Sequence, residues 1–147
     1  MIDRKFIGYA WTPYTLEVEK GRLRFFAKAI GETNPIYTDE AAARAAGYPS
    51  LPIPPTFLFS LENDVPDLYG WLTPMGVDLG ELLHGEQTFK YHAMVFAGER
   101  VTFEPRIADI YDKKKGALEF IVKETKVRNA SGELVAELRN VLVVRHG

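Results

Sequence analysis

The second half of the chain contains four strand-length segments that follow one another at short intervals. Each is rich in Val, Ile, Phe and Tyr, which favour a pleated, half-buried strand. Because short turns join antiparallel strands, this spacing predicts an antiparallel sheet. Pro105 cannot donate a ladder hydrogen bond, so its strand must carry a bulge or an edge position there. The predicted strands run from Glu86 to Phe96, Val101 to Asp112, Ala117 to Val127, and Leu134 to Arg145.

The first half of the chain has helical periodicity instead. From Glu19 to Ile30 the apolar positions recur at the spacing of one helical face, and Gly31 marks the end of that helix. A second, short helix is predicted with Thr38 as its N-cap and the Ala-rich run up to Ala46 as its body. Several prolines then predict an extended connector. The stretch from Thr56 to Asn63 is predicted to form a third helix, apolar on most of its sides.

An antiparallel sheet needs one face covered, and the apolar helix is the element available to cover it. We therefore predict an α+β fold, with a curved antiparallel sheet wrapped around a central apolar helix. The length of 147 residues is that of one ordinary domain, so residues 1–147 are expected to form a single domain. The segment from Val65 to Leu83 is irregular, and such long insertions are typical of a functional flap or a disordered loop.

The composition excludes several function classes. The chain has no Cys, which removes disulfides, thiolate metal sites and cysteine nucleophiles. A net charge of −2, with no basic stripe beyond Lys113 to Lys115, argues against nucleic acid as a partner. Neither metal-ligand spacing nor a Gly-rich phosphate loop is present, so we expect no metal and no cofactor. Without an apolar span or a signal peptide, a cytoplasmic protein with no membrane partner is expected.

One motif connects the first two predicted helices. It reads AIGETNPIYTDEAAARAAG and begins at Ala29. This stretch resembles the hydratase motif of the MaoC-like hydratases and dehydratases of the hot-dog superfamily, which runs Gly-Asp-x-Asn-Pro-aliphatic-His. Glu32 stands where that family has Asp, and Tyr37 stands where it has His. The segment from Leu82 to Val101 resembles the branch with amino-terminal MaoC-like dehydratase domains, so the resemblance covers essentially the whole chain and implies the hot-dog fold.

The resemblance also implies a reaction, the reversible addition of water to a 2-enoyl thioester that gives an (R)-3-hydroxyacyl thioester. This chemistry needs a base for the water, an acid for the α-carbon, and a donor that stabilises charge on the thioester oxygen. In the family, Asp and His handle the water and the protons. A backbone N–H at the start of the buried helix polarises the thioester carbonyl.

All three elements are altered in this sequence. Glu32 keeps a carboxylate, but its extra methylene moves the charged group by about 1 Å, a displacement that can cost about a hundredfold in rate. Tyr37 is a plausible proton donor and a poor base, because a phenol titrates near pH 10 and imidazole near 6.5. Pro55 has no N–H, so Thr56 can take its place only if the register shifts by one residue.

The resemblance therefore implies the non-catalytic, substrate-channel half of a heteromer with a catalytic MaoC-like subunit, as in the heteromeric 3-hydroxyacyl dehydratases. One alternative is a self-sufficient homodimeric hydratase that uses Glu32 with His84 or Tyr37. Another is an acyl-thioester binding module without turnover, or a hot-dog thioesterase, because fold alone does not determine the reaction. In each case the expected partners are an acyl-CoA or acyl-carrier-protein thioester and a second hot-dog subunit, identical or different.

The candidate site residues each have a structural interpretation beside the functional one. Glu32 can cap the turn after the first helix instead of taking part in chemistry. His84 lies between the irregular segment and the next strand, where Glu86 would be able to orient it, whereas His92 is interpreted as an ordinary strand residue. Aromatic side chains at these spacings line an acyl tunnel or form ordinary core. The candidate substrate-binding residues are Asn34, Pro55, Thr56, Phe57, Phe59 and Trp71.

Overall fold

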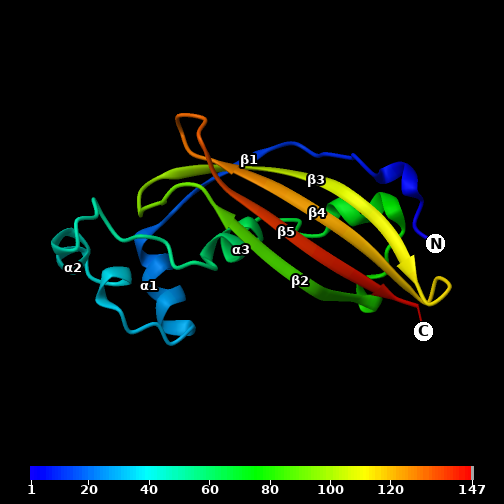
Figure 1. The fold of residues 1–147 in the computed structure, drawn as a ribbon, viewed down its shortest axis with the longest axis horizontal. Helices are drawn as coiled ribbons and strands as arrows, with labels where there is room; N and C mark the ends of the chain where they lie inside the picture. The colour runs from blue at the N-terminus through cyan, green and yellow to red at the C-terminus, as the bar shows by residue number, and fades with distance from the viewer. Residues whose placement is uncertain (147) are drawn as a thin grey trace.

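A five-stranded antiparallel sheet forms the body of the protein in the computed structural model, which describes residues 1–146. The strand order is β1-β3-β4-β5-β2, so the two edges are strands β1 and β2 (Figure 1). The three longest strands lie together in the middle, and each pairs antiparallel with its neighbours. The strands are β1 (Tyr14–Glu17), β2 (Leu82–Tyr91), β3 (Arg100–Lys113), β4 (Leu118–Arg128) and β5 (Leu134–Arg145).

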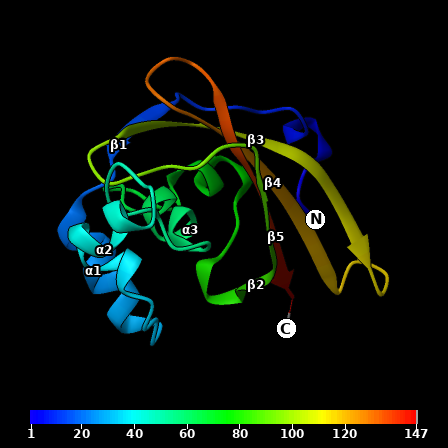
Figure 2. The same ribbon diagram turned by 60° about the vertical axis from the view of Figure 1, so that its left-hand side comes forward.

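Three α-helices accompany the sheet. They are α1 (Lys20–Ala29), α2 (Glu40–Ala45) and α3 (Phe57–Glu62). Helix α3 lies inside the curve of the sheet, whereas α1 and α2 lie together at one end of the molecule (Figure 2). The predicted α+β fold, with a sheet wrapped around an apolar helix, is therefore confirmed. No helix within residues 1–146 has both the length and the hydrophobicity that a membrane crossing requires.

Helix α3 is buried because its side chains are apolar on nearly every side. Phe57, Leu58 and Leu61 are each exposed by 1% or less and pack with residues of β3, β4 and β5 in one core cluster. A second cluster, under the far end of the sheet, contains Ile107, Ile121 and Leu142. The irregular segment predicted as a flap or loop covers this second cluster, since Leu72 and Met75 of its 3-10 turn Gly70–Met75 are buried there.

Several local predictions need correction. Asp39 caps helix α2, in place of Thr38, because the Asp39 side chain accepts a hydrogen bond from the Ala41 N–H at 2.8 Å. Strand β2 begins at Leu82, four residues before the predicted start, and ends at Tyr91. The structure also contains β1, a strand absent from the sequence prediction. It is only four residues long, too short to give an alternation that stands out from its surroundings.

Pro105 lies where strand β3 has a partner on one side only. Its backbone is paired with Thr125 of β4, whereas the pairing of β3 with β1 ends at Phe103. The next contact on that side is an isolated bridge between Ala10 and Arg106. A register shift in β3 follows between Ile107 and Asp109. The missing N–H of Pro105 thus costs no sheet hydrogen bond, which agrees with the predicted edge position.

Candidate functional site

The Glu32 turn, residues 30–37, directly follows the C-terminal end of helix α1. Gly31 has φ +71°, a left-handed conformation that favours glycine. The Glu32 N–H then donates to the Ala27 carbonyl at 2.9 Å. The Glu32 carboxylate accepts from the Asn34 N–H at 2.9 Å, and the Asn34 side chain accepts from the Ile36 N–H at 3.2 Å. Both polar side chains thus cap the short 3-10 turn Pro35–Tyr37, as in the structural interpretation of the motif.

A pocket of about 370 Å³ brings the end of the Glu32 turn to the start of helix α3. The connector before α3 is held in place beside it, because the Ile53 N–H donates to the Val95 carbonyl at 3.0 Å. The pocket therefore gathers the motif, the connector and the end of β2, which are far apart in the sequence. We call it the Tyr37 pocket. It is lined by Ile36, Tyr37, Tyr48, Pro52, Ile53, Pro55, Tyr91, His92, Ala93, Met94 and Val95.

Two phenols in this pocket, those of Tyr37 and Tyr91, are held in their protonated form. Burial raises the pKa of Tyr37, and the nearby Glu32 carboxylate and Tyr48 raise it further. Burial also raises the pKa of Tyr91 to about 12. A phenol with a pKa this high donates a hydrogen bond at neutral pH but does not accept a proton as a base.

The start of helix α3 lacks the usual backbone donors. Pro54 and Pro55 have no N–H, and the Phe57 N–H donates to the Pro54 carbonyl at 3.0 Å. The first available donor is the N–H of Thr56, which has no hydrogen-bond partner within residues 1–146. Pro55 and Thr56 are both exposed, so this donor lies at the surface, one residue from the pocket lining.

His84 lies in a different pocket, of about 320 Å³, together with Gly85, Gln87 and Asn140. Its ring is edge-on to the ring of Phe59, with centroids 5.9 Å apart. The Glu86 carboxylate has no hydrogen bond to His84, and its nearest charged partner is Arg139, at 3.7 Å. Within one chain, the structure thus does not place His84 in the same pocket as Tyr37, and Glu86 does not orient it.

The other aromatic candidates lie away from the Tyr37 pocket. Phe57 is buried and packs edge-on against Phe26, with ring centroids 5.4 Å apart. Trp71 stacks on Trp11 at 4.9 Å between centroids and belongs to the second core cluster. These contacts agree with the interpretation of both side chains as core residues.

A buried ion pair, absent from the sequence prediction, lies between helix α3 and the sheet. Lys123 Nζ is 2.9 Å from Glu62 Oε1, and the two side chains are 10% and 1% exposed. The Thr125 hydroxyl donates to the same carboxylate oxygen at 2.5 Å, while Glu62 Oε2 has no partner. The sequence does hint at this ion pair, because Lys123 alternates with Ile121 and Thr125 along β4 and so faces the same, inner side of the sheet.

By contrast, no local sequence pattern indicates that Tyr48 and Tyr91 lie near Tyr37.

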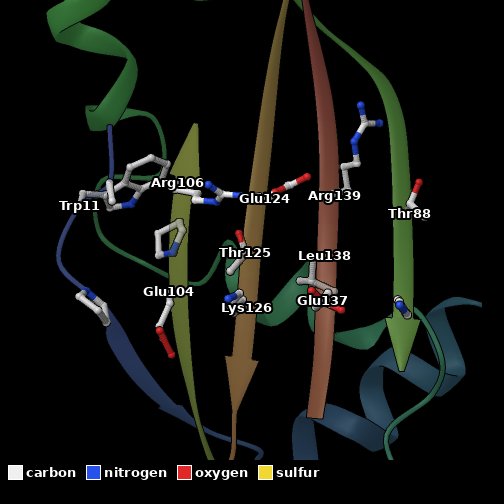
Figure 3. A pocket seen from close by; sticks show the side chains of 14 residues that line it. Trp11, Thr88, Glu104, Arg106, Glu124, Thr125, Lys126, Glu137, Leu138 and Arg139 are labelled. Carbon is white, nitrogen blue, oxygen red and sulfur yellow. Dashed lines mark hydrogen bonds and ion pairs between the residues drawn. The ribbon is translucent and has the colours of Figure 1, made fainter. Parts of the chain in front are cut away.

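A hollow of about 890 Å³ lies on the opposite face of the sheet from the helices (Figure 3). The charged residues that line it alternate in sign from one strand to the next. Glu124 of β4 lies between Arg106 of β3 and Arg139 of β5. Arg106 forms an ion pair with Glu124 at 2.9 Å. No residue of the Glu32 turn lines this hollow. Charge that is balanced in this way does not select a ligand of one sign.

Within residues 1–146, no group of His, Asp and Glu is placed to hold a metal ion.

The fold and the Glu32 turn together define a hot-dog protein of the dehydratase type. The sequence matches the family described as "FAS1-like, dehydratase domain region" over residues 5–138, so the chain belongs to this family. Among its relatives are UPF0336 proteins, which match over nearly their whole length. The protein from Saccharopolyspora erythraea is 32% identical over 98% of this chain and 92% of its own, and that from Streptomyces coelicolor is 33% identical over 98% and 95%.

Solved structures of similar fold include dehydratases and hydratases. The C-terminally truncated HadBC (3R-hydroxyacyl-ACP dehydratase) complex from Mycobacterium tuberculosis contains a chain 29% identical to this one, with a TM-score of 0.80 over 94% of this chain and 96% of its own. The (R)-hydratase from A. caviae involved in PHA biosynthesis has a TM-score of 0.71 at 19% identity, over 92% and 94%. The predicted membership of the MaoC-like hot-dog proteins is thus confirmed.

Proposed function

We propose that this chain is the substrate-channel half of a heteromeric enzyme that hydrates 2-enoyl thioesters or dehydrates (R)-3-hydroxyacyl thioesters. The observation that carries the proposal is the character of the Tyr37 pocket. It lies beside the Glu32 turn and its lining is mostly apolar, as a thioester site requires, yet the residue in the position of the family His is a phenol with a raised pKa. Such a group is a hydrogen-bond donor and not a base. The imidazole of His92 also lines the pocket, but its Nε2 is already paired with the Glu137 carboxylate at 2.8 Å, so we infer that another subunit supplies the base.

The hydrogen bonds of the Glu32 turn also support a non-catalytic role for this chain. The Glu32 carboxylate already accepts the Asn34 N–H, which favours a capping function over activation of water. With prolines before it, the start of α3 offers the Thr56 N–H as its first backbone donor to a thioester oxygen. The catalytic subunit would therefore bring the carboxylate and imidazole that move the protons, while this chain would contribute apolar walls and the Tyr37 and Tyr91 hydroxyls.

Edge strand β2 is the surface through which a second hot-dog subunit would join. It pairs with β5 along one side only, which leaves a long row of backbone donors and acceptors for another strand. Its Leu83 is 52% exposed, and Tyr91 at its other end is 41% exposed. A complex of two different chains has a precedent among structures of similar fold, since the HadBC and ChsH1-ChsH2 structures are both named as complexes.

Hydration of crotonyl-CoA tests the proposal directly. We expect no turnover by the purified chain, and turnover when it is mixed with a MaoC-like chain that has an intact Gly-Asp-x-Asn-Pro-x-His motif. The same mixture with the partner's Asp replaced by Asn is the matched control and is expected to be inactive. Turnover by this chain alone would contradict the proposal.

A second candidate is the self-sufficient homodimer, because the Glu32 turn contains both a carboxylate and the Tyr37 phenol. If the chain alone hydrates crotonyl-CoA, Glu32→Gln distinguishes the two mechanisms. A loss of about a hundredfold or more in rate, the usual scale for a general acid–base group, would assign the carboxylate a catalytic role. The variants His84→Gln and Tyr37→Phe then identify its acid–base partner in the same assay.

A further inference from the structure

Helix α1 carries four cations and no carboxylate. Lys20, Arg22, Arg24 and Lys28 lie within its ten residues, although the chain as a whole has a net charge of −2. The buried side of the helix is formed by Leu23 and Ala27. The residues that face solvent lie at helical spacing on the opposite side and include two of the cations. They are Gly21, Arg24, Phe25 and Lys28.

Two of the four cations are neutralised by carboxylates and two are not. Lys20 Nζ lies 2.8 Å from Glu40, and Arg22 forms an ion pair with Asp64. Within residues 1–146, neither Arg24 nor Lys28 has a carboxylate partner. Arg24 and Lys28 therefore leave a local excess of positive charge on the solvent-facing side of α1.

An exposed aromatic ring lies on the same side of α1 as these two free cations. The Phe25 side chain is 75% exposed, more than any other large apolar residue except Met1. Scattered apolar residues are ordinary on a protein surface. An exposed aromatic ring on one helical face with two cations is different, because aromatic residues and Arg are enriched where protein partners bind. We call the surface formed by Arg24, Phe25 and Lys28 the α1 face.

The α1 face is hydrogen-bonded to the residue that follows the Glu32 turn. Arg24 Nε donates to the Thr38 carbonyl at 2.9 Å, one residue beyond the phenol that lines the pocket. The Glu32 turn is bonded to the end of the same helix through the Ala27 carbonyl. A partner bound on the α1 face would therefore lie beside the end of the pocket formed by the Glu32 turn.

We propose that the α1 face docks an acidic acyl carrier protein, which delivers the thioester to this subunit in place of free coenzyme A. This inference rests on the proposed function. A carrier protein presents carboxylates and apolar side chains over an extended surface, which complements an exposed ring on one helical face with two cations. The phosphates of coenzyme A would instead need cations that converge on a cavity, and none of Arg24, Phe25 and Lys28 lines the hollows described above.

Binding of the holo acyl carrier protein from the same organism tests the inference. We expect saturable binding to the full chain, alone or in its complex, with a Kd that rises with salt. The double variant Phe25→Ala/Lys28→Glu is expected to weaken binding about tenfold, through loss of the central contact and of charge complementarity. The matched control is Leu79→Ala/Lys126→Glu, which truncates another exposed apolar residue and reverses another exposed charge. It is expected to change the Kd less than twofold.

Equal effects of the two double variants, or the absence of saturable binding, would overturn the inference. Turnover of crotonyl-CoA by the mixed complex is measured separately, because it reports on the proposed function and not on docking. If the complex hydrates crotonyl-CoA but binds the carrier protein equally well without the α1 face, the inference fails and the proposed function stands. If no combination of subunits hydrates a thioester, the proposed function fails whatever the binding experiment shows.

Discussion

Glu62 places a carboxylate inside the core at the last residue of helix α3. Lys123 supplies the compensating charge from strand β4 at 2.9 Å, and the Thr125 hydroxyl donates to the same oxygen. A buried pair of this kind adds little net stability, because desolvation of both charges offsets their attraction. Removal of one member is costly, however, because the remaining charge stays buried without a partner.

The variant Lys123→Ala is therefore expected to lower the free energy of unfolding by about 3–5 kcal/mol, measured by urea denaturation. Lys126→Ala is the control on the same strand, since Lys126 is exposed, and its effect should stay within about 0.5 kcal/mol. The double variant Glu62→Leu/Lys123→Met should recover most of the loss. An effect of Lys123→Ala below about 1 kcal/mol would show that water already solvates Glu62.

His146 links the end of β5 to two carboxylates. Its ring lies 2.6 Å from Glu119 and 3.1 Å from Glu81, and Glu119 also accepts the Ile2 N–H at 2.7 Å. The hydrogen bond to Glu119 raises the pKa of His146, opposed by burial and assisted by Glu81. Burial alone would raise the pKa of Glu119, but the hydrogen bonds from His146 and Ile2 and the charge of the amino terminus lower it overall.

These two shifts predict how stability depends on pH. The His146 contribution is complete below 6.5, its ordinary pKa, and is lost as the pH rises through the raised pKa of the folded protein. The Glu119 contribution is complete above 4.5 and is lost as the pH falls through its lowered pKa. The Tm difference between the wild type and His146→Ala should therefore be largest between pH 4.5 and 6.5. A Tm difference that is constant from pH 4 to pH 9 would contradict the predicted contribution of His146 and Glu119 to stability.

At the scale of elements, helix α2 is short enough for one cap to determine its stability. Asp39 is expected to stabilise it by about 1 kcal/mol, the usual value for a side chain that bonds the first free N–H groups. Asp39→Ala should lower the free energy of unfolding by that amount, and Thr38→Ala, one residue earlier, should have almost no effect. Urea denaturation of both variants measures the difference. A larger loss of stability in Thr38→Ala than in Asp39→Ala would instead identify Thr38 as the cap.

Whether a segment forms a helix or a strand was predictable from the spacing of its apolar residues. Residues on the buried side recur every two positions along a strand and every three or four along a helix. This pattern places α1, α3 and the three long strands within a few residues of their observed bounds. It fails for β1, whose four residues are stabilised by pairing with distant β3. It also fails between Val65 and Leu83, where Pro and Gly indicate a loop but 3-10 turns cover the second core cluster.

The candidate site was predictable only in part. Local hydrogen bonds determine the Glu32 turn, so its geometry follows from the motif itself. By contrast, Tyr48 and Tyr91 meet Tyr37 through tertiary packing alone, and a single sequence contains no periodic signal for such contacts. The separation of His84 from Tyr37 has the same origin, since it depends on how β2 is placed against β5.

At the scale of the whole molecule, the sheet is open along β2. Leu83→Lys places a charge on that edge, whereas Leu79→Lys places one outside the strand at an equally exposed leucine, since both side chains are 52% exposed. If subunits join through β2, Leu83→Lys should raise the dimer dissociation constant about tenfold, or about 1.4 kcal/mol. Analytical ultracentrifugation measures this constant. Equal dissociation constants for the two variants would place the interface elsewhere.

The strand order also has a consequence for how the chain reaches its native state during synthesis. Strand β2 closes the pocket around α3 but is hydrogen-bonded only to β5, which is synthesised last of all the strands. Until residues 134–145 have left the ribosome, the hydrophobic side of β2 has no partner within the chain. The core around β2 can therefore close only once β5 is available, by a long-range closure. This delay gives a second subunit time to compete for the same strand.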